Sequence, residues 1–455
     1  MTKFFRCLLL TVSAVLFVSS CDSDTKLVYP PEDVVNRVTD FYVFNDGKSF
    51  IYLNSNMNRK YDFGELVLKE IDDEGDLVFK DSLLVPSVAG KMTVSSDEKN
   101  IFITTRDKHG VVKAKVSGKS GSYRLQYEEG TKGDYPEILK TKKEPYALML
   151  NEDESKLMVT HILNGELSVI DLEEWKVIKT AKLKYGVTEI IFDKNSGYFL
   201  ASHKSSGNIS LIEAKETLED FVVAVKELPI DLPTQGFDVR SLKQSGDGTV
   251  FYAAFQNAYD EDSYEYSYDE DTAPQIVTFK IEDNALEIVK TLAVRGNLGE
   301  LAVLSYTTES AGSTEETDDN AVNDSDIAEE TDSDEETVND SDVVEETDSD
   351  EETIDDSDAE ETDENKTVHR TGDLIFVSVP TDEKVLIIDS ARNSVRDEIS
   401  YIDDKKECKP YQLYTKNTGN TTGYLFVSCF QNDRVYVYSV DLMSEEIIKK
   451  IGVLE

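Results

Sequence analysis

The feature that most constrains the fold is a repeat that aligns without a gap in four places. In each copy an apolar run ends on a small or polar residue, a tight polar turn follows, and a second apolar run alternates to a polar stop. Turn pairs such as Asn164-Gly165 tolerate hairpin geometry, so each copy predicts an antiparallel β-hairpin. The four copies are LMVTHILNGELSVID (157–171), FLASHKSSGNISLIE (199–213), IFVSVPTDEKVLIID (375–389) and LFVSCFQNDRVYVYS (425–439).

Each hairpin is flanked by two further apolar strands, such as 145–155 before one and 174–183 after it. Repeated four-stranded units of this length are typical of β-propeller blades. A sandwich does not explain the ungapped alignment across the chain, and a solenoid would leave sheet edges open that a closed ring protects. We therefore expect an all-β, seven-bladed propeller of antiparallel blades over 38–455. The expected blades start near residues 38, 88, 143, 186, 235, 298 and 408.

The best-formed repeat resembles that of the YVTN-type seven-bladed propellers. Val159-Thr160 and the run 167–171 match the family motif, whereas His161 stands where the family has Asn. The resemblance covers most of 38–455. It implies a surface or periplasmic protein, often a scaffold, with lactonase-like relatives.

The amino terminus predicts export. Lys3 and Arg6 precede an apolar run of about a dozen residues, too short to span a bilayer but typical of a secretory signal. Residues 18–21 (VSSC) resemble the bacterial lipoprotein box, which implies that 1–20 are removed and Cys21 is acylated, with palmitate among its chains. Residues 21–37 would then be a tether at the cell envelope. An ordinary signal peptide is the alternative, and the choice between inner and outer membrane stays open.

The net charge is −45, and much of it is local. Residues 309–364 hold 28 acids and no base, which leaves 92 − 28 = 64 acids against 47 bases, or −17, elsewhere. Like charge repels nucleic acid and anionic lipid surfaces. We expect no nucleic acid partner. The expected partners are a membrane reached through the lipid on Cys21 and an envelope protein or glycan.

The acidic stretch contains a 16-residue repeat, at 322–337 and again at 338–353. Such a segment buries too little apolar surface to order itself, so 308–370 is expected to be a disordered insert between the first two strands of blade six. Spaced carboxylates suit weak calcium binding, but the glycine-containing loop of EF-hands is absent. A solvated charged spacer is the better interpretation.

Two cysteines remain after export, Cys408 and Cys429. They would lie opposite each other in a hairpin of blade seven, which predicts a structural disulfide. His161 and His203 occupy the same repeat position. That equivalence explains them better than a metal pair does, and we expect neither a metal site nor a catalytic motif.

Two functions remain open. In the first, the chain is a binding or scaffold module, and a tyrosine-rich loop between two strands of blade five is its expected contact surface. The alternative for this loop is a mobile solvated segment. Its tyrosines are Tyr259, Tyr264, Tyr266 and Tyr268. The alternative is a lactonase-like hydrolase, whose acids would be Glu189, Asp238 and Glu300 at the central opening. A pocket with converging carboxylates favours the enzyme, and a flat tyrosine-rich face favours binding.

Overall fold

The computed structural model describes ten segments of the chain, which are built almost entirely of strands. These segments are 27–127, 136–204, 207–216, 221–229, 238–256, 273–283, 285–310, 368–402, 408–444 and 446–455. They contain 29 strands and one short 3₁₀ turn, Pro380–Asp382. Within these segments no helix is long and apolar enough to cross a membrane.

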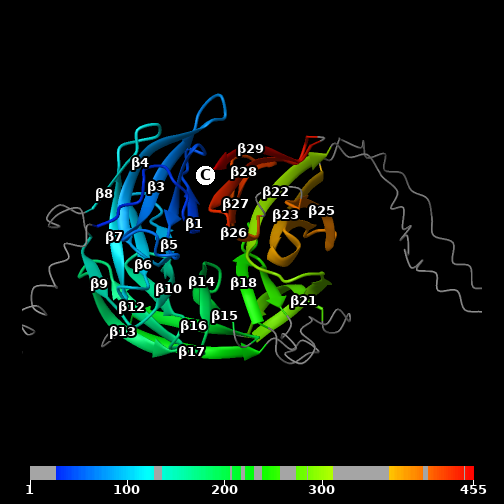
Figure 1. Cartoon of the computed structure of the whole chain (residues 1–455). Coiled ribbons are helices and arrows are strands. Elements are labelled where there is room, and N and C mark those ends of the chain that lie inside the picture. Colours follow the sequence, from blue (N-terminus) through cyan, green and yellow to red (C-terminus); the bar gives the residue numbers. More distant parts are fainter. Residues whose placement is uncertain are drawn as a thin grey trace, which may run out of the picture. The chain divides into compact units, whose positions relative to one another are not determined.

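The strands form seven antiparallel sheets that follow one another along the chain, which confirms the predicted propeller (Figure 1). We call the strands of each blade a to d, from the channel outward. Blades one to three consist of β1 (Val38–Val43), β2 (Ser49–Asn54), β3 (Phe63–Ile71) and β4 (Leu77–Pro86); β5 (Ala89–Val94), β6 (Asn100–Thr105), β7 (Gly110–Ser117), β8 (Arg124–Tyr127) and β9 (Ile138–Lys140); and β10 (Pro145–Leu150), β11 (Lys156–His161), β12 (Glu166–Asp171) and β13 (Lys176–Lys182). Blades four and five consist of β14 (Val187–Asp193), β15 (Tyr198–His203), β16 (Asn208–Glu216) and β17 (Phe221–Pro229); and β18 (Asp238–Gln244), β19 (Phe251–Gln256), β20 (Gln275–Glu282) and β21 (Ala285–Ala293). Blades six and seven consist of β22 (Leu301–Ser310), β23 (Val368–Val379), β24 (Lys384–Asp389) and β25 (Ser394–Ser400); and β26 (Pro410–Asn417), β27 (Thr422–Cys429), β28 (Arg434–Asp441) and β29 (Ile448–Leu454).

Blade two departs from the predicted four strands. Its outer position is shared by β8 and β9, which both pair with β7. Gly110 allows β9 to approach, since a Cβ at this position would meet the Leu139 carbonyl oxygen at 2.5 Å. The seven strands next to the channel start within three residues of the predicted blade starts.

A β-bulge occurs near the start of the a strand in six blades. It explains why the repeat has polar residues near the end of strand b. Bulges re-aim side chains and leave backbone groups to be paired. A hydroxyl near the end of strand b takes over that pairing: Lys91 N donates to Thr104 Oγ1 at 3.0 Å, and Ala147 N donates to Thr160 Oγ1 at 3.3 Å. The bulges lie between Val38 and Asp40, Ala89 and Met92, Pro145 and Leu148, Val187 and Glu189, Val239 and Ser241, and Pro410 and Gln412.

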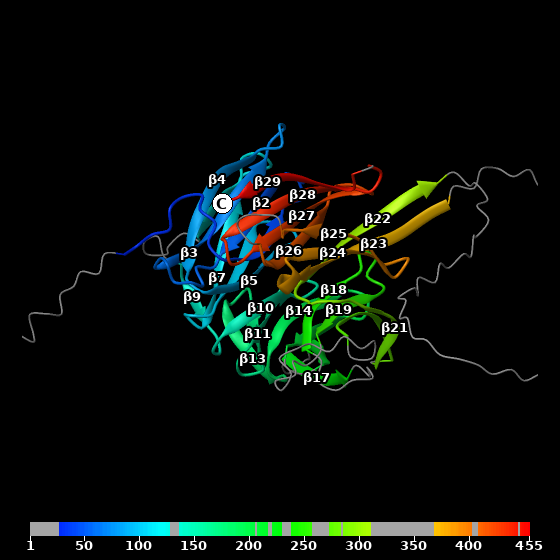
Figure 2. The ribbon, with the colours of Figure 1, turned by 45° about the vertical axis from the view of Figure 1, so that its right-hand side comes forward.

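The ring closes where the first blade meets the last. Blade one contains only strands from the amino-terminal end of the chain and blade seven only strands from the carboxy-terminal end, so the two share no strand. Figure 1 places β1 beside β26 and β27, which it contacts, and in Figure 2 β2 of the first blade lies beside the strands of blade seven. Phe426 packs against Phe41 and Phe50, with ring centroids 5.7 and 5.1 Å apart, and the Arg37 guanidinium lies 3.5 Å from Asp433. Side chains rather than shared strands therefore hold the ring shut.

The predicted disulfide between Cys408 and Cys429 is present, and both cysteines are buried in the core of the last two blades. The strand order also confirms that residues between β22 and β23 are inserted between strands a and b of blade six. The acidic repeat itself lies outside the described residues.

Candidate functional site

Six bulged a strands and the residue before β22 each place one side chain toward the central channel. The a strands of blades one to five contact their neighbours, and β1 also contacts β26, so these positions form a ring around the channel. The residue type differs from blade to blade. The members of the ring are Asp40, Lys91, Ala147, Glu189, Ser241, Glu300 and Gln412.

A cavity of about 400 Å³ lies in the channel and is bounded by the a strands. Its walls are mainly apolar, and its polar groups are concentrated at the charged members of the ring, a composition typical of small-molecule sites. Apolar lining residues include Phe41, Met92, Leu148, Ile190, Val303 and Leu413.

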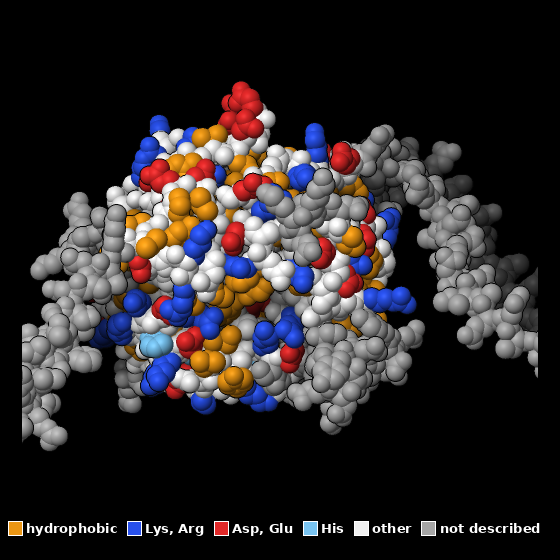
Figure 3. Space-filling model, in the orientation of Figure 1, with side chains coloured by type: hydrophobic (Ala, Val, Ile, Leu, Met, Phe, Trp, Pro, Cys, Tyr) orange, Lys and Arg blue, Asp and Glu red, His pale blue; other side chains and the backbone are white. Residues whose placement is uncertain are grey.

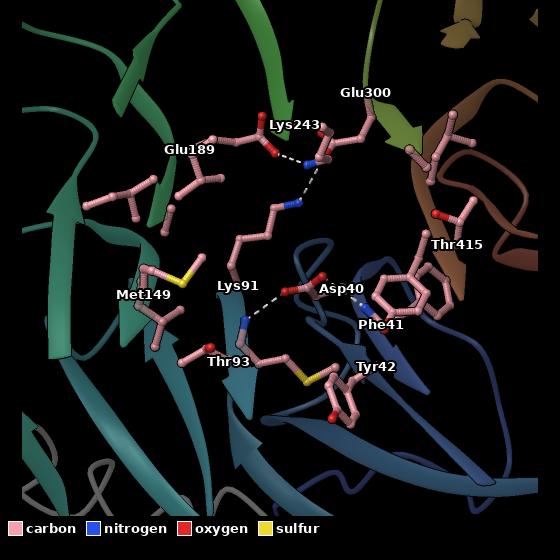
Figure 4. Close-up of a pocket in the computed structure, with 18 of the residues that line it drawn as sticks. Asp40, Phe41, Tyr42, Lys91, Thr93, Met149, Glu189, Lys243, Glu300 and Thr415 are labelled. Atoms are coloured by element: carbon pink, nitrogen blue, oxygen red, sulfur yellow. Dashed lines mark hydrogen bonds and ion pairs between the residues drawn. The ribbon is translucent and has the colours of Figure 1, made fainter. Parts of the chain in front are cut away.

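Four charged side chains from different blades converge on this cavity (Figure 4). Lys243 Nζ contacts Glu300 Oε1 at 3.0 Å and also pairs with Glu189. Lys91 Nζ lies 3.5 Å from the same Glu300 oxygen and donates to Gln412 Oε1 at 2.6 Å. Lys243 is the most open of the four, with 27% of its side chain exposed, whereas Glu189 retains 9%. A ligand in the cavity would therefore meet Lys243 first.

The pKa values of Glu189 and Glu300 are shifted in opposite directions. Burial raises the pKa of Glu189 to about 7, and the neighbouring Glu300 carboxylate adds to the effect. Burial acts on Glu300 in the same direction, but Lys243 and Lys91 outweigh it and hold the pKa of Glu300 well below its usual range. Glu189 and Glu300 are hydrogen-bonded to each other, so their titrations are coupled.

Several ring members also cap the bulge of the next blade. Met92 N donates to Asp40 Oδ2 at 2.8 Å, and Leu242 N donates to Glu189. Ser241 completes the pattern by accepting the Leu301 N–H at 3.0 Å. In each case the acceptor of one blade satisfies the amide that follows the ring residue of the next. Glu189 thus has a structural duty in addition to any chemistry.

Two tyrosines meet above the charged ring. Tyr146 of β10 and Tyr411 of β26 each precede the ring residue of their strand, and their side chains are hydrogen-bonded to each other. The cavity is lined by the ring and by later residues of the a strands. The cavity therefore lies between the Tyr146–Tyr411 pair and the a–b turns.

The structure brings together two of the three acids that the sequence singled out. Glu189 and Glu300 line the cavity, but Asp238 does not and instead pairs with Arg240 at 3.2 Å. Sequence reasoning missed Lys91 and Lys243. Lys91 could have been found by aligning the a strands, because it occupies the ring position, whereas Lys243 lies two residues beyond it.

His161 and His203 are equivalent, as predicted, and both are fully buried. The His161 ring bonds the Lys143 carbonyl at 3.1 Å and Ser168 Oγ at 2.9 Å. His203 makes the matching contacts with Tyr185 O and Ser210 Oγ. These bonds use both ring nitrogens to connect strand b to its neighbours. In the described segments no three His, Cys, Asp or Glu side chains are grouped as metal ligands.

The remaining predicted sites lie outside the described residues. These are the acylation site Cys21 and the tyrosine loop with Tyr259, Tyr264, Tyr266 and Tyr268. They stay predictions.

Comparison with solved structures supports the fold and goes no further. Hydrazine synthase of Kuenenia stuttgartiensis is similar with a TM-score of 0.54 at 9% identity, over 91% of this chain and 97% of that one. A putative 6-phosphogluconolactonase of Bacteroides fragilis and the periplasmic gluconolactonase of Pseudomonas aeruginosa both give TM-scores of 0.46, at 12% and 11% identity, each over 80% of this chain and 84% of theirs. The chain matches no protein-family model and no curated protein sequence.

Proposed function

We propose that this chain is an exported, lipid-anchored propeller of the bacterial cell envelope that binds a small ligand with an apolar body and one polar group in its central channel. The observation that carries the proposal is the cavity of about 400 Å³ bounded by Lys91, Glu189, Lys243 and Glu300. Burying ionic groups is costly, so the gathering of four of them at one cavity suggests a binding role. Export and anchoring rest on the signal-like start and on Cys21.

The cavity suits a ligand with an apolar body and one hydrogen-bond-accepting group. Apolar walls would bury the body, and the Lys243 ammonium, which pairs with Glu189 and Glu300, would also bind a hydroxyl, carbonyl or carboxylate oxygen. The raised pKa of Glu189 would let the site adjust its charge to the ligand. The tyrosine loop of blade five would serve as a separate contact surface for an envelope protein or glycan.

Binding can be tested with the chain from residue 22, which contains every described residue. The melting temperature and native mass would be measured in the presence of carboxylic and hydroxy acids that carry an apolar chain. Lys243→Met keeps much of the side-chain volume while removing the ammonium. Thr249→Ala, in an exposed turn, serves as the control. A ligand that stabilises the parent and the control but not Lys243→Met would support the proposal, and the absence of any stabilising ligand would contradict it.

Lactonase-like hydrolysis is the second candidate, and the pKa of about 7 at Glu189 favours it. A group with that pKa can act as a general base near neutral pH, and the two lysines could stabilise an oxyanion. Against this, Glu189 already accepts from Leu242 N and Lys243. Titrimetric assay of D-glucono-δ-lactone hydrolysis decides between the two functions: turnover that Glu189→Gln abolishes would establish the enzyme, and binding without turnover would establish the receptor.

A further inference from the structure

The face that carries the b–c and d–a loops, here called the upper face, is basic over blades two to four. Seven lysines in these loops are exposed. Among the described residues, these loops and the strand ends beside them hold nine bases against four acids, in a chain whose net charge is −45. One more acid of these loops, Asp231, lies outside the described residues. We call these seven residues the lysine patch: Lys108, Lys140, Lys142, Lys143, Lys182, Lys184 and Lys204.

Backbone hydrogen bonds join the loops of the lysine patch into one surface. Thr141 N donates to His109 O at 2.9 Å, and Ile162 N donates to Glu144 O at 3.1 Å. Gly186 N then donates to Ile162 O at 3.1 Å, and Lys204 N donates to Gly186 O at 2.8 Å. The loops of three successive blades are therefore fixed side by side. Figure 3 views this face, and its basic side chains gather near the visible histidine at lower left.

Three of the four described acids of this face pair with bases outside the patch. Asp107 pairs with Arg59, Glu144 with Arg106, and Asp238 with Arg240. The fourth acid, Glu166, lies opposite Lys182 in the β12–β13 pairing. No patch lysine forms an ion pair with a carboxylate in the described segments.

Two exposed apolar side chains lie within the patch. Leu163 in the b–c turn of blade three is 51% exposed, and Tyr185 in the following d–a loop is 56% exposed. Lysines surrounding aromatic and aliphatic tips are typical of surfaces that lie at a membrane interface. A soluble polyanion would gain nothing from these apolar tips.

The amino-terminal segment runs along the same face. Asn56 N and Ser55 N, at the start of the b–c loop of blade one, donate to Asn36 O and Arg37 O, and Asp62 N at the end of that loop donates to Val28 O at 2.9 Å. The chain that leads back to Cys21 therefore leaves from the loops of the upper face. A tether of this kind would hold that face close to the bilayer.

We propose that the lysine patch docks on the anionic headgroups of a phospholipid bilayer, with Leu163 and Tyr185 at the interface. The acidic charge of the whole chain does not prevent this, because surface potentials are screened within about 8 Å at physiological ionic strength. The turns at the other end of the same blades carry acids such as Glu152, Asp153 and Glu154, so only the upper face fits. The cavity, which lies toward the a–b turns, would then face the aqueous side. The inference rests on the proposed function only in placing a membrane nearby.

Vesicle binding tests the inference without the anchor. The chain from residue 22 would be sedimented with vesicles of phosphatidylglycerol and phosphatidylcholine, and with vesicles of phosphatidylcholine alone. We expect salt-sensitive binding to the anionic vesicles only. The triple variant Lys142→Glu, Lys143→Glu, Lys184→Glu should bind at least about a hundredfold more weakly, since each lost basic residue contributes about fivefold and the new carboxylates are repelled by the anionic surface.

The matched control reverses Lys119, Lys176 and Lys194, which are exposed in turns at the other end of the same blades. This control should bind the anionic vesicles as well as the parent does. Equal binding by both triple variants, or no binding by the parent, would overturn the inference. Retention on dextran sulfate without vesicle binding would overturn it too and would assign the patch to an anionic glycan. None of these outcomes affects ligand binding in the channel, so failure of this inference is distinguishable from failure of the proposed function.

Discussion

The carboxylate of Glu189 in blade four accepts the backbone N–H of Leu242 in blade five, and the same side chain pairs with Lys243 beside the central cavity. One residue thus joins two blades and supplies half of a coupled carboxyl pair. Asp40 joins blades one and two in the same way, through the N–H of Met92. The channel surface and the blade contacts are therefore not independent.

Replacing Glu189 should separate these roles. Glu189→Gln retains an acceptor for Leu242 N, whereas Glu189→Ala leaves that buried N–H unpaired, a loss of about 1–3 kcal/mol. We expect the alanine variant to unfold at a clearly lower denaturant concentration than the glutamine variant. Equal midpoints in chemical denaturation would show that the inter-blade bond contributes little.

Glu189 should also make stability fall as pH rises through the weakly acidic range. Its pKa is raised from 4.5 to about 7 on folding, so between these values the folded chain keeps a proton that the unfolded chain releases. Its contribution is fully present below pH 4.5 and is lost as pH rises to about 7. Thermal unfolding across this window should show a smaller decline for Glu189→Gln than for the parent. Parallel curves would contradict the assignment.

His161 should have the opposite effect. Burial lowers its pKa from 6.5 to about 4, so the unfolded chain takes up a proton first as the solution is acidified. The contribution is present above pH 6.5 and is lost as pH falls to about 4. Replacing His161 and His203 together with Asn should flatten the acid-induced loss, measured as the midpoint of unfolding against pH. His109, which is partly exposed, provides the control substitution.

The disulfide should stabilise the last blade. The cysteines are 21 residues apart, and in the chain-entropy model a loop of this length contributes about 3 kcal/mol. The double variant Cys408→Ala, Cys429→Ala should lose about this much free energy of unfolding in chemical denaturation. Addition of a reductant should destabilise the parent and leave the double variant unchanged. A parent that is insensitive to full reduction would contradict the prediction.

Phe426 should be critical because side chains alone close the ring. Removing a buried phenylalanine costs about 3–5 kcal/mol, and Phe426 contacts both Phe41 and Phe50 of the first blade. We expect Phe426→Ala to be destabilised more than Phe192→Ala, whose ring is only partly buried within blade four. Equal losses in chemical denaturation would show that closure does not depend on this contact.

The sequence by itself determined the repeated unit, the number and order of the blades, the place of the insert and the cysteine pair. It could do so because strand alternation and turn residues are local signals, and because each blade is one contiguous segment. The equivalence of His161 and His203 was predictable for the same reason.

Only the tertiary structure decided which side chains meet. Glu189 and Glu300 converge with Lys91 and Lys243 because four blades bring their a strands around one axis, and Asp238 is excluded because it begins its strand outside the ring level. The lysine patch likewise arises from loops of separate blades. Spacing along a chain fixes which residues share a strand position, but the distance between charges in different blades depends on how the ring closes.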